Sequence, residues 1–356
     1  MDIIEKYTPS GTRDLIYEEA FAEKELENKL YRLYLTLGYK PIETPVLEYY
    51  DVFNHEQRYI PDQTIYKFTD NEGKLVALRP DNTSPVVRVA LSKLKDEALP
   101  LLLCYSQPVF RNNLAFHAKR DQILQCGVEL IGGETPETDL RCLFTALQTL
   151  NASGSFYKLE LGHAGFFDAL ITDYALSENE IADLRSFISA RNSGGYAFTL
   201  NMTNPAAVSL ARELPRLCGS PDRVLPRARV LAKGRPGAQK ILDELETTCS
   251  MLTEAGYGTS LILDLGIVQV INYYTGIVFR GYLDGVGEAV LSGGRYDHLL
   301  AGFGSDLGAC GFGFNISEAA KVNPRQLPPS VPLSFADGVN SLKDAQRVLD
   351  RMGKED

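Results

Sequence analysis

Apolar and polar positions along this chain follow two periods, about three to four residues in some segments and two in others. Segment 17–37 has the longer period, which is that of an amphipathic helix, and Gly38 suits the position just after its end. Its apolar positions are Phe21, Leu26, Leu30, Leu33 and Leu37. Segment 39–53 reads as extended chain followed by a short helix. It contains Pro41 and Pro45, and because Pro45 has no N–H to donate, we expect its strand at the edge of a sheet.

Strand-like and helix-like segments then follow one another. Residues 75–94 predict a strand, a turn and a helix that Asp81, Thr83 or Ser84 is placed to cap. The later segments are β-rich at 99–111 and 122–132, helical at 135–150, extended at 155–163, helical and polar from about 170 to 258, and extended again from 260 to 285. The sequence therefore predicts a sheet whose two halves are separated by a helical insertion.

The C-terminal part of the sequence changes character. Segment 323–334 is rich in proline and is typical of a linker. The residues that follow it are too few for an independent domain. We therefore expect a core over residues 1–325, with its insertion at about 170–258, and a linker with a short C-terminal remnant over 326–356.

Composition and charge narrow the function classes. The chain has 36 basic and 46 acidic residues, a net charge of −10, which argues against a surface that coats nucleic acid. Its six cysteines have no CxxC spacing, so we expect small buried side chains in a reducing compartment and no metal site. The first residues are charged, and no run of 18 apolar residues occurs. We expect a cytoplasmic protein without membrane spans or a cofactor.

The segment 122–132 carries the first candidate chemistry. In a strand, Gln125, Gly127 and Glu129 point to one face, while the apolar residues between them point to the other. An amide, an open position and a carboxylate along one face suit a flat ligand with an N–H or ammonium group, because Gly127 lets it approach the backbone. The alternative is a solvated strand face with a bulge at the glycine.

Arg111 ends the preceding β-rich segment, and its neighbour across the loop is the strand of Gln125 and Glu129. A guanidinium holds a carboxylate through two parallel hydrogen bonds. Together with Asp81 and Glu129, Arg111 would match the zwitterion of an amino acid. The alternative for Arg111 is a cation at a strand end on the surface.

Two further motifs lie near the C-terminal strands. Tyr273 and Tyr274 are adjacent, so on a strand only one of them can line a given pocket, and the other packs in the core. Arg295, in the motif SGGRYD, either binds a ligand or pairs with Asp297.

Eight segments occur in the order of a class II aminoacyl-tRNA synthetase core and resemble histidyl-tRNA synthetase specifically. They are GTRD (11–14), IETPVLE (42–48), LRPDNTSP (78–85), VFR (109–111), QCGVELIG (125–132), NYYTG (272–276), SGGRYDHLL (292–300) and GFGF (311–314). The resemblance implies an α+β fold with a mainly antiparallel sheet flanked by helices, and dimerisation through the region around Pro45. It also implies that the residues contacting histidine are Asp81, Thr83, Gln125, Glu129, Tyr273 and Tyr274.

The chain departs from that family at the residues expected to handle ATP. Asn112 and Asn113 follow Arg111 where the family has His-Glu, and Ile123 stands where an aromatic ring is expected. Gln269 replaces an arginine before the Tyr-Tyr pair, and Glu318 replaces the arginine that ends the third motif. We also expect no anticodon-binding domain. Because adenylate formation needs cations on the phosphates, we expect ATP activation of histidine to be lost while the histidine pocket is kept.

This combination resembles a paralogous branch of the family, the regulatory subunits of short-form ATP phosphoribosyltransferase, in the first step of histidine biosynthesis. The resemblance implies a chain without catalytic residues that binds a catalytic subunit and mediates feedback by L-histidine. One alternative is a synthetase-like ligase that activates histidine or a related amino acid with ATP, which Arg111 and the glycine-rich strands would support. Another is an RNA-binding relative, suggested by the basic segment 223–235, although a solvated helix face also explains that segment and tRNA is not an expected partner.

Overall fold

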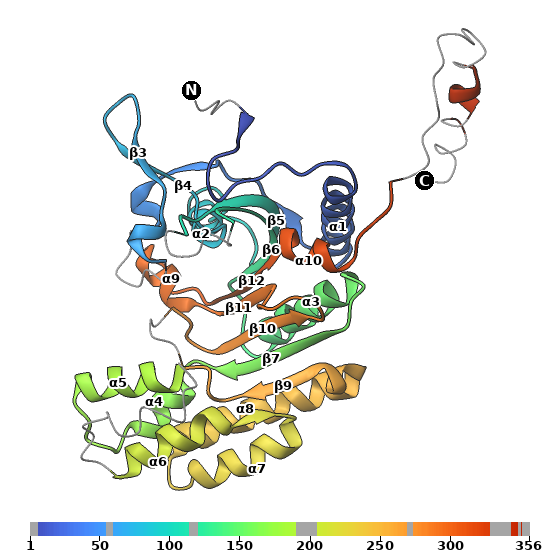
Figure 1. The fold of residues 1–356 in the computed structure, drawn as a ribbon. Helices are drawn as coiled ribbons and strands as arrows, with labels where there is room; N and C mark the ends of the chain where they lie inside the picture. The colour runs from blue at the N-terminus through green and yellow to red at the C-terminus, as the bar shows by residue number, and fades with distance from the viewer. Residues whose placement is uncertain are drawn as a thin grey trace.

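The computed structural model describes residues 6–54, 60–113, 120–189, 205–268, 273–327, 343–347 and 350. Its centre is a nine-stranded sheet with helices packed against it, and a three-stranded sheet stands beside it (Figure 1). The strand order of the large sheet is β1-β5-β6-β12-β11-β10-β7-β9-β8. Only the pairs β1·β5 and β7·β9 are parallel, so the predicted α+β fold with a mainly antiparallel sheet is confirmed.

The strands of the large sheet are β1 Lys40–Pro41, β5 Leu101–Phe110, β6 Gln122–Ile131, β7 Tyr157–His163, β8 Cys218–Gly219, β9 Leu261–Asp264, β10 Ile277–Leu283, β11 Leu291–Arg295 and β12 Ala309–Asn315. The small sheet has the order β2-β4-β3 and consists of β2 Leu47–Tyr49, β3 Lys67–Thr69 and β4 Leu75–Leu78. The extended segment around Pro45 contains β1 and β2, and both are edge strands, as expected, although Pro45 itself lies between them.

Two long helices, α1 Tyr17–Thr36 and α3 Glu137–Ala152, cover one face of the large sheet. The helical period predicted α1 well, and Gly38 follows its end with a φ of 88°, a left-handed conformation that glycine adopts without strain. The buried stripe of α1 contains Ala22, Leu26, Leu30 and Tyr34, so Tyr34 rather than Leu33 enters the core.

The predicted insertion consists of helices between β7 and β9, and Figure 1 places them beyond β7 and β9, away from α1 and α2. They are α4 Phe166–Ile171, α5 Glu178–Ser189, α6 Pro205–Glu213, α7 Pro221–Leu231 and α8 Pro236–Leu252. The sequence pattern did not predict β8, a two-residue strand inside this segment that pairs with β9 at the sheet edge. In α7, Arg229 pairs with Asp243 and Glu246, so part of the basic segment is neutralised by α8.

The remaining helices are short or lie near the candidate site. They are α2 Thr83–Ser92, α9 Asp297–Gly302 and α10 Ile316–Ala319, with single turns η2 Tyr50–Val52, η3 Asp62–Thr64, η5 Leu214–Arg216, η6 Thr253–Tyr257, η7 Gly258–Ser260 and η8 Ala320–Val322. Of the three residues placed to cap α2, Asp81 does so, since its Oδ1 accepts a hydrogen bond of 2.8 Å from the Ser84 N–H.

Five of the six cysteines are buried, as expected. Cys218 is exposed instead, because β8 is an edge strand of two residues and leaves its side chain uncovered. Among the described residues, no helix is both long and apolar enough to cross a membrane.

Candidate functional site

The floor of the candidate site is the face of the large sheet that α1 and α3 do not cover. On β6, Cys126 and Val128 pack in the core with α1 and α3, so Gln125, Gly127 and Glu129 point to the opposite face, as the period of two predicts. Glycines of β12 lie opposite them, with Gly311 paired to Glu129 and Gly313 paired to Gly127. The polar side chains of β6 therefore lie over backbone.

The glycines of this floor have little space around them for a side chain. A Cβ at Gly311 would lie 1.8 Å from Oε2 of Glu129, and a Cβ at Gly313 would lie 2.4 Å from Nε2 of Gln125. Gly127 is enclosed in the same way, because its Cβ would lie 2.1 Å from the carbonyl oxygen of Phe312. Glycine is required at Gly127 and Gly311, where a side chain would also meet backbone carbonyl oxygens, while a side chain at Gly313 would displace the Gln125 amide.

A cavity of about 460 Å³ lies above this floor. Its lining comes from β5, β6, β11, β12, α10 and the segments that precede α2 and β10. The lining residues are Asp81, Thr83, Tyr105, Val109, Arg111, Asn113, Arg120, Ile123, Gln125, Tyr273, Tyr274, Glu288, Ala289, Val290, Ser292, Gly313, Asn315, Glu318 and Lys321. Six of the seven predicted site residues are in this set, and the seventh, Glu129, lies directly behind it.

Glu129 is completely buried and receives three hydroxyl groups. Thr83 Oγ1 donates to Oε1 at 2.8 Å, Tyr105 OH donates to the same oxygen at 3.4 Å, and Tyr296 OH donates to Oε2. Burial raises the pKa of Glu129 to about 8, against the opposing effect of the Tyr296 and Thr83 hydrogen bonds. At neutral pH most of this carboxyl is therefore protonated, and it contacts the cavity through Thr83 and Tyr105.

Tyr273 and Tyr274 both line the cavity, so the prediction that only one of them would line it was wrong. Tyr273 is also buried in a hydrophobic cluster with Tyr105 and Tyr296, as expected for the tyrosine that packs in the core. The error has a local cause, because β10 begins only at Ile277, and Tyr273 and Tyr274 precede it in an irregular segment without a period of two. Their ring centroids are 4.7 Å apart at an interplanar angle of 70°, and Tyr273 stacks on Tyr296 at 5.7 Å. Together they form an aromatic wall.

Asp81 and Arg111 provide opposite charges to the cavity. Asp81 is nearly fully buried and is held by its bond from the Ser84 N–H. Arg111 Nε donates to the carbonyl oxygen of Pro80 at 2.7 Å, which fixes the guanidinium at the cavity wall. The two charges suit a ligand that carries both an ammonium and a carboxylate.

Arg295, the other cation considered from the sequence, does not line the cavity. It pairs with Asp297 at 3.1 Å, which was one of its two predicted roles. It also makes contacts that the sequence did not indicate, since Nε lies 3.0 Å from Oδ1 of Asp139 and Nη2 donates to Thr138 Oγ1 at 2.8 Å. These buried bonds tie β11 to the start of α3.

We call the part of the cavity lined by Asn113, Ile123, Glu318 and Lys321 its outer half, and the first three of these are positions at which the sequence departs from the synthetase pattern. Glu318 forms an ion pair of 2.6 Å with Lys321, and its N–H donates to Oδ1 of Asn315 at 3.1 Å. Asn113 and Ile123 also line this part. The predicted substitution at Gln269 lies outside the described residues.

Several lining residues were not anticipated. Tyr105 and Val109 lie in β5, six and two residues before Arg111. Both spacings are even, so the period of two already placed these side chains on the same face as Arg111. Glu288 and Lys321 gave no such signal, because they come from a loop and from a short helix turn far along the chain.

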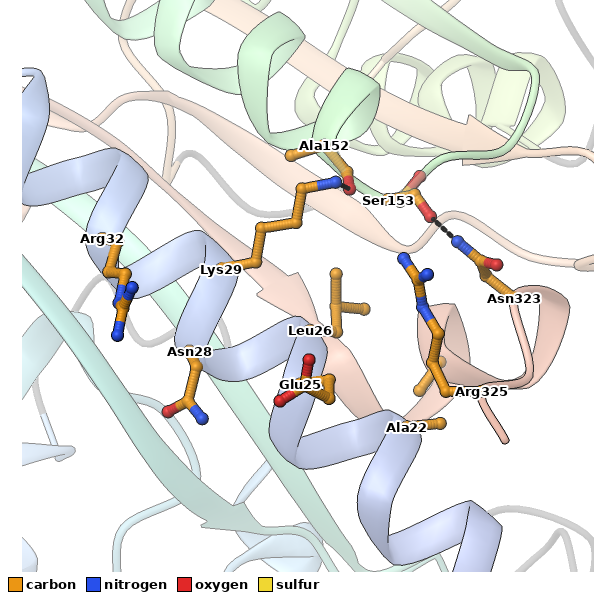
Figure 2. Close-up of a pocket in the computed structure, with 11 residues that line it drawn as sticks. Ala22, Glu25, Leu26, Asn28, Lys29, Arg32, Ala152, Ser153, Asn323 and Arg325 are labelled. Carbon is orange, nitrogen blue, oxygen red and sulfur yellow. Dashed lines mark hydrogen bonds between the residues drawn. The ribbon is translucent and has the colours of Figure 1, made fainter. Parts of the chain in front are cut away.

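A second cavity, of about 340 Å³, lies between α1, the end of α3 and residues 320–325 (Figure 2). Lys29 Nζ donates to the carbonyl oxygen of Ala152 at 2.6 Å, and Asn323 Nδ2 donates to that of Ser153 at 2.7 Å. These bonds join the end of α3 to its two neighbours. None of the predicted site residues lies here, so this cavity is best described as a packing seam.

Comparisons with known proteins show the family to which this chain belongs. The family model described as Histidyl-tRNA synthetase matches residues 11–319. A protein of Clostridium acetobutylicum named ATP phosphoribosyltransferase regulatory subunit is 37% identical over 318 residues, which are 88% of this chain and 78% of that protein. The protein of the same name from Bacillus mycoides is 32% identical and aligns with 98% of this chain and 84% of its own length.

Solved structures give the same result. A crystal structure from Bacillus halodurans, described as an ATP phosphoribosyltransferase regulatory subunit/histidyl-tRNA synthetase, is similar with a TM-score of 0.81 and 33% identity, covering 89% of this chain and 83% of that one. Histidyl-tRNA synthetase from Nostoc sp. PCC 7120 also has a TM-score of 0.81, at 22% identity over 97% of this chain and 84% of that one, which supports the fold alone.

Proposed function

The chain belongs to the histidyl-tRNA synthetase family and, within it, to the ATP phosphoribosyltransferase regulatory subunits, and from this premise we propose that it senses L-histidine in the synthetase-like cavity. It is a regulatory subunit of ATP phosphoribosyltransferase, and we propose that the catalytic residues of the transferase belong to another chain. We propose that it binds the short-form catalytic subunit in the cytoplasm and that histidine bound here changes the activity of that complex.

The observation that carries the proposal is the joint placement of complementary groups around one cavity. Asp81 suits an ammonium, Arg111 suits a carboxylate, and Tyr273 and Tyr274 suit a flat ring. The Thr83 hydroxyl is oriented by Glu129, which gives the site a fixed polar group beside that wall. The volume of about 460 Å³ is in the ordinary range for a small-molecule site.

The outer half of the cavity supports binding without adenylation. Adenylate formation requires cations that stay available for the phosphate charge that develops. Here Lys321 is engaged with Glu318, and Ile123 offers no aromatic surface to an adenine. Among the residues that the structure describes, the cavity offers the ligase alternative only two cations besides Lys321, namely Arg111 and Arg120, so we do not favour that alternative.

The binding test is a calorimetric titration with L-histidine and then with ATP, followed by an assay of pyrophosphate–ATP exchange. We expect histidine to bind, ATP not to bind and exchange to be absent. Arg111→Gln should weaken histidine binding, because the carboxylate loses a bidentate partner, while Arg32→Gln in the second cavity is the matched control. Histidine-dependent exchange would overturn the proposal in favour of a ligase.

We also propose that the chain forms a dimer through the small sheet that follows Pro45. Leu47, Tyr49 and Phe68 share one face of this sheet and are 48%, 51% and 43% exposed. A contiguous apolar face of this kind is typical of an interaction site. Light scattering should show a dimer that Tyr49→Asp dissociates, while Phe156→Asp, at a remote phenyl ring that is also exposed, leaves it intact. A monomeric wild-type chain would disprove this interface.

A further inference from the structure

Asn82 is a fully buried amide beneath the candidate cavity. It occupies the position just before α2, where asparagine usually caps the helix with its side chain. Here it makes no such bond, because Asp81 already accepts from the Ser84 N–H. The Asn82 amide is instead directed at the sheet, and a local helix-capping role does not explain it.

The neighbours of Asn82 fix which end of its amide points where. Its Nδ2 lies 3.5 Å from the backbone carbonyl oxygen of Gln107 and 3.2 Å from Oε1 of Gln125. A backbone carbonyl is always an acceptor, so the end of Asn82 that faces it must be the NH₂ group. The same NH₂ group faces Gln125, whose amide must therefore present its oxygen to Asn82.

The other end of the Asn82 amide supports this orientation. Oδ1 of Asn82 is buried and has no hydrogen-bond partner within the described part of the chain. An unsatisfied buried acceptor destabilises a fold, so an amide that was free to turn would turn. Turning would place that oxygen against the Gln107 carbonyl oxygen, which explains why the orientation persists.

The consequence appears at the cavity. With its oxygen held by Asn82, Gln125 directs Nε2 over Gly313, since a Cβ there would lie 2.4 Å from Nε2 but 3.3 Å from Oε1. Gln125 and Gly313 both line the cavity. Gln125 therefore offers the ligand a donor at this point, and an ammonium group, which has only hydrogens to give, finds no acceptor there.

We propose that Asn82 is a positioning residue that holds Gln125 as a hydrogen-bond donor, so that this cavity reads a carboxylate or another acceptor of its ligand at Gln125. The proposal deepens the proposed histidine sensing and rests on it for the identity of the ligand. The donor at Gln125 complements Arg111, while the ammonium is left to Asp81.

The test compares L-histidine with histamine, which has the same ring and ammonium but no carboxylate. In the wild-type chain we expect L-histidine to bind at least tenfold more tightly, as roughly 1.5–3 kcal/mol per charged hydrogen bond implies. Asn82→Asp removes the donor that holds Gln125, so Gln125 turns its NH₂ group toward the introduced carboxylate. The preference for L-histidine over histamine should then fall about tenfold or more. Asn82→Leu should give an intermediate preference.

A merely structural role for Asn82 predicts a different outcome, in which both ligands lose affinity equally and their ratio is unchanged. That result, in variants that keep the wild-type melting temperature, would overturn the proposal. If the wild-type chain binds neither ligand, the proposal of histidine sensing fails. The positioning of Gln125 by Asn82 is then tested by NMR on the protein without ligand. The NH₂ resonances of Gln125, assigned with Gln125→Met, should shift in Asn82→Asp if the proposal holds, and unchanged resonances would refute it.

Discussion

The buried carboxyl of Glu129 makes the stability of this protein dependent on pH in a direction that can be calculated. The folded-state pKa is about 8 and the ordinary value is 4.5. Between these values the unfolded chain releases the proton while the folded chain keeps it, so the free energy of unfolding falls as pH rises. One proton gives a slope of about 1.4 kcal/mol per pH unit, so the free energy of unfolding should fall by roughly 2–3 kcal/mol between pH 5.5 and 7.5.

Glu129→Gln should remove this slope. Glutamine resembles the protonated acid, and its amide oxygen can still accept the bonds from Thr83 and Tyr105. We therefore expect the variant to match the wild-type chain near pH 5 and to become progressively more stable than it toward pH 8. Above pH 8 the difference should stay constant, because both states of the wild-type chain are then ionised.

Urea unfolding at half-unit intervals from pH 5 to 9 measures this effect, provided that the m-value stays constant. Glu178→Gln, in the exposed first turn of α5, is the matched control and should leave the pH dependence unchanged. Parallel stability curves for the wild-type chain and Glu129→Gln would refute the reasoning. They would show that the carboxyl is as easily ionised in the fold as in the unfolded chain.

Two further predictions concern other buried groups. Burial lowers the pKa of His163 from 6.5 to about 4, so the free energy of unfolding of the wild-type chain should fall by about 1.4 kcal/mol per pH unit as pH falls between these values. Urea unfolding of His163→Asn should not show this fall, and an unchanged loss of stability at acid pH in the variant would contradict the reasoning. Arg295→Leu should destabilise the fold by about 3–5 kcal/mol, because it leaves the buried Asp139 carboxylate without its partner. In the same assay, the double variant with Asp139→Leu should recover much of that loss. If the effects of the two single changes simply add, the pairing is contradicted.

Much of the fold was predictable because its main elements have strong, regular periods. The helical period of 17–37 and the alternation of 122–132 each describe how one element meets a core, and that core holds both elements as expected. The alternation also placed Gln125 and Glu129 on one face. Local sequence carries this information because side-chain direction follows from backbone geometry.

The parts that could not be predicted depend on contacts between distant segments. Asp139 and Arg295 are 156 residues apart, and nothing near either one indicates the other. Whether Glu129 faces a ligand or is shielded by hydroxyl groups depends on Tyr296, which comes from a different loop. The error at Tyr273 and Tyr274 had a simpler cause, since the alternation rule was applied to residues that precede the strand.

The glycine floor has an evolutionary consequence. Gly127, Gly311 and Gly313 have no room for a side chain, so almost any mutation there damages the site at once. The residues around the outer half, such as Glu318 and Lys321, form a helix turn that can change without disturbing the sheet beneath it. A lineage with this architecture can therefore exchange one ligand chemistry for another by altering the walls alone. The same glycine-lined sheet face can form the base of a sensor's binding site as well as that of an enzyme's active site.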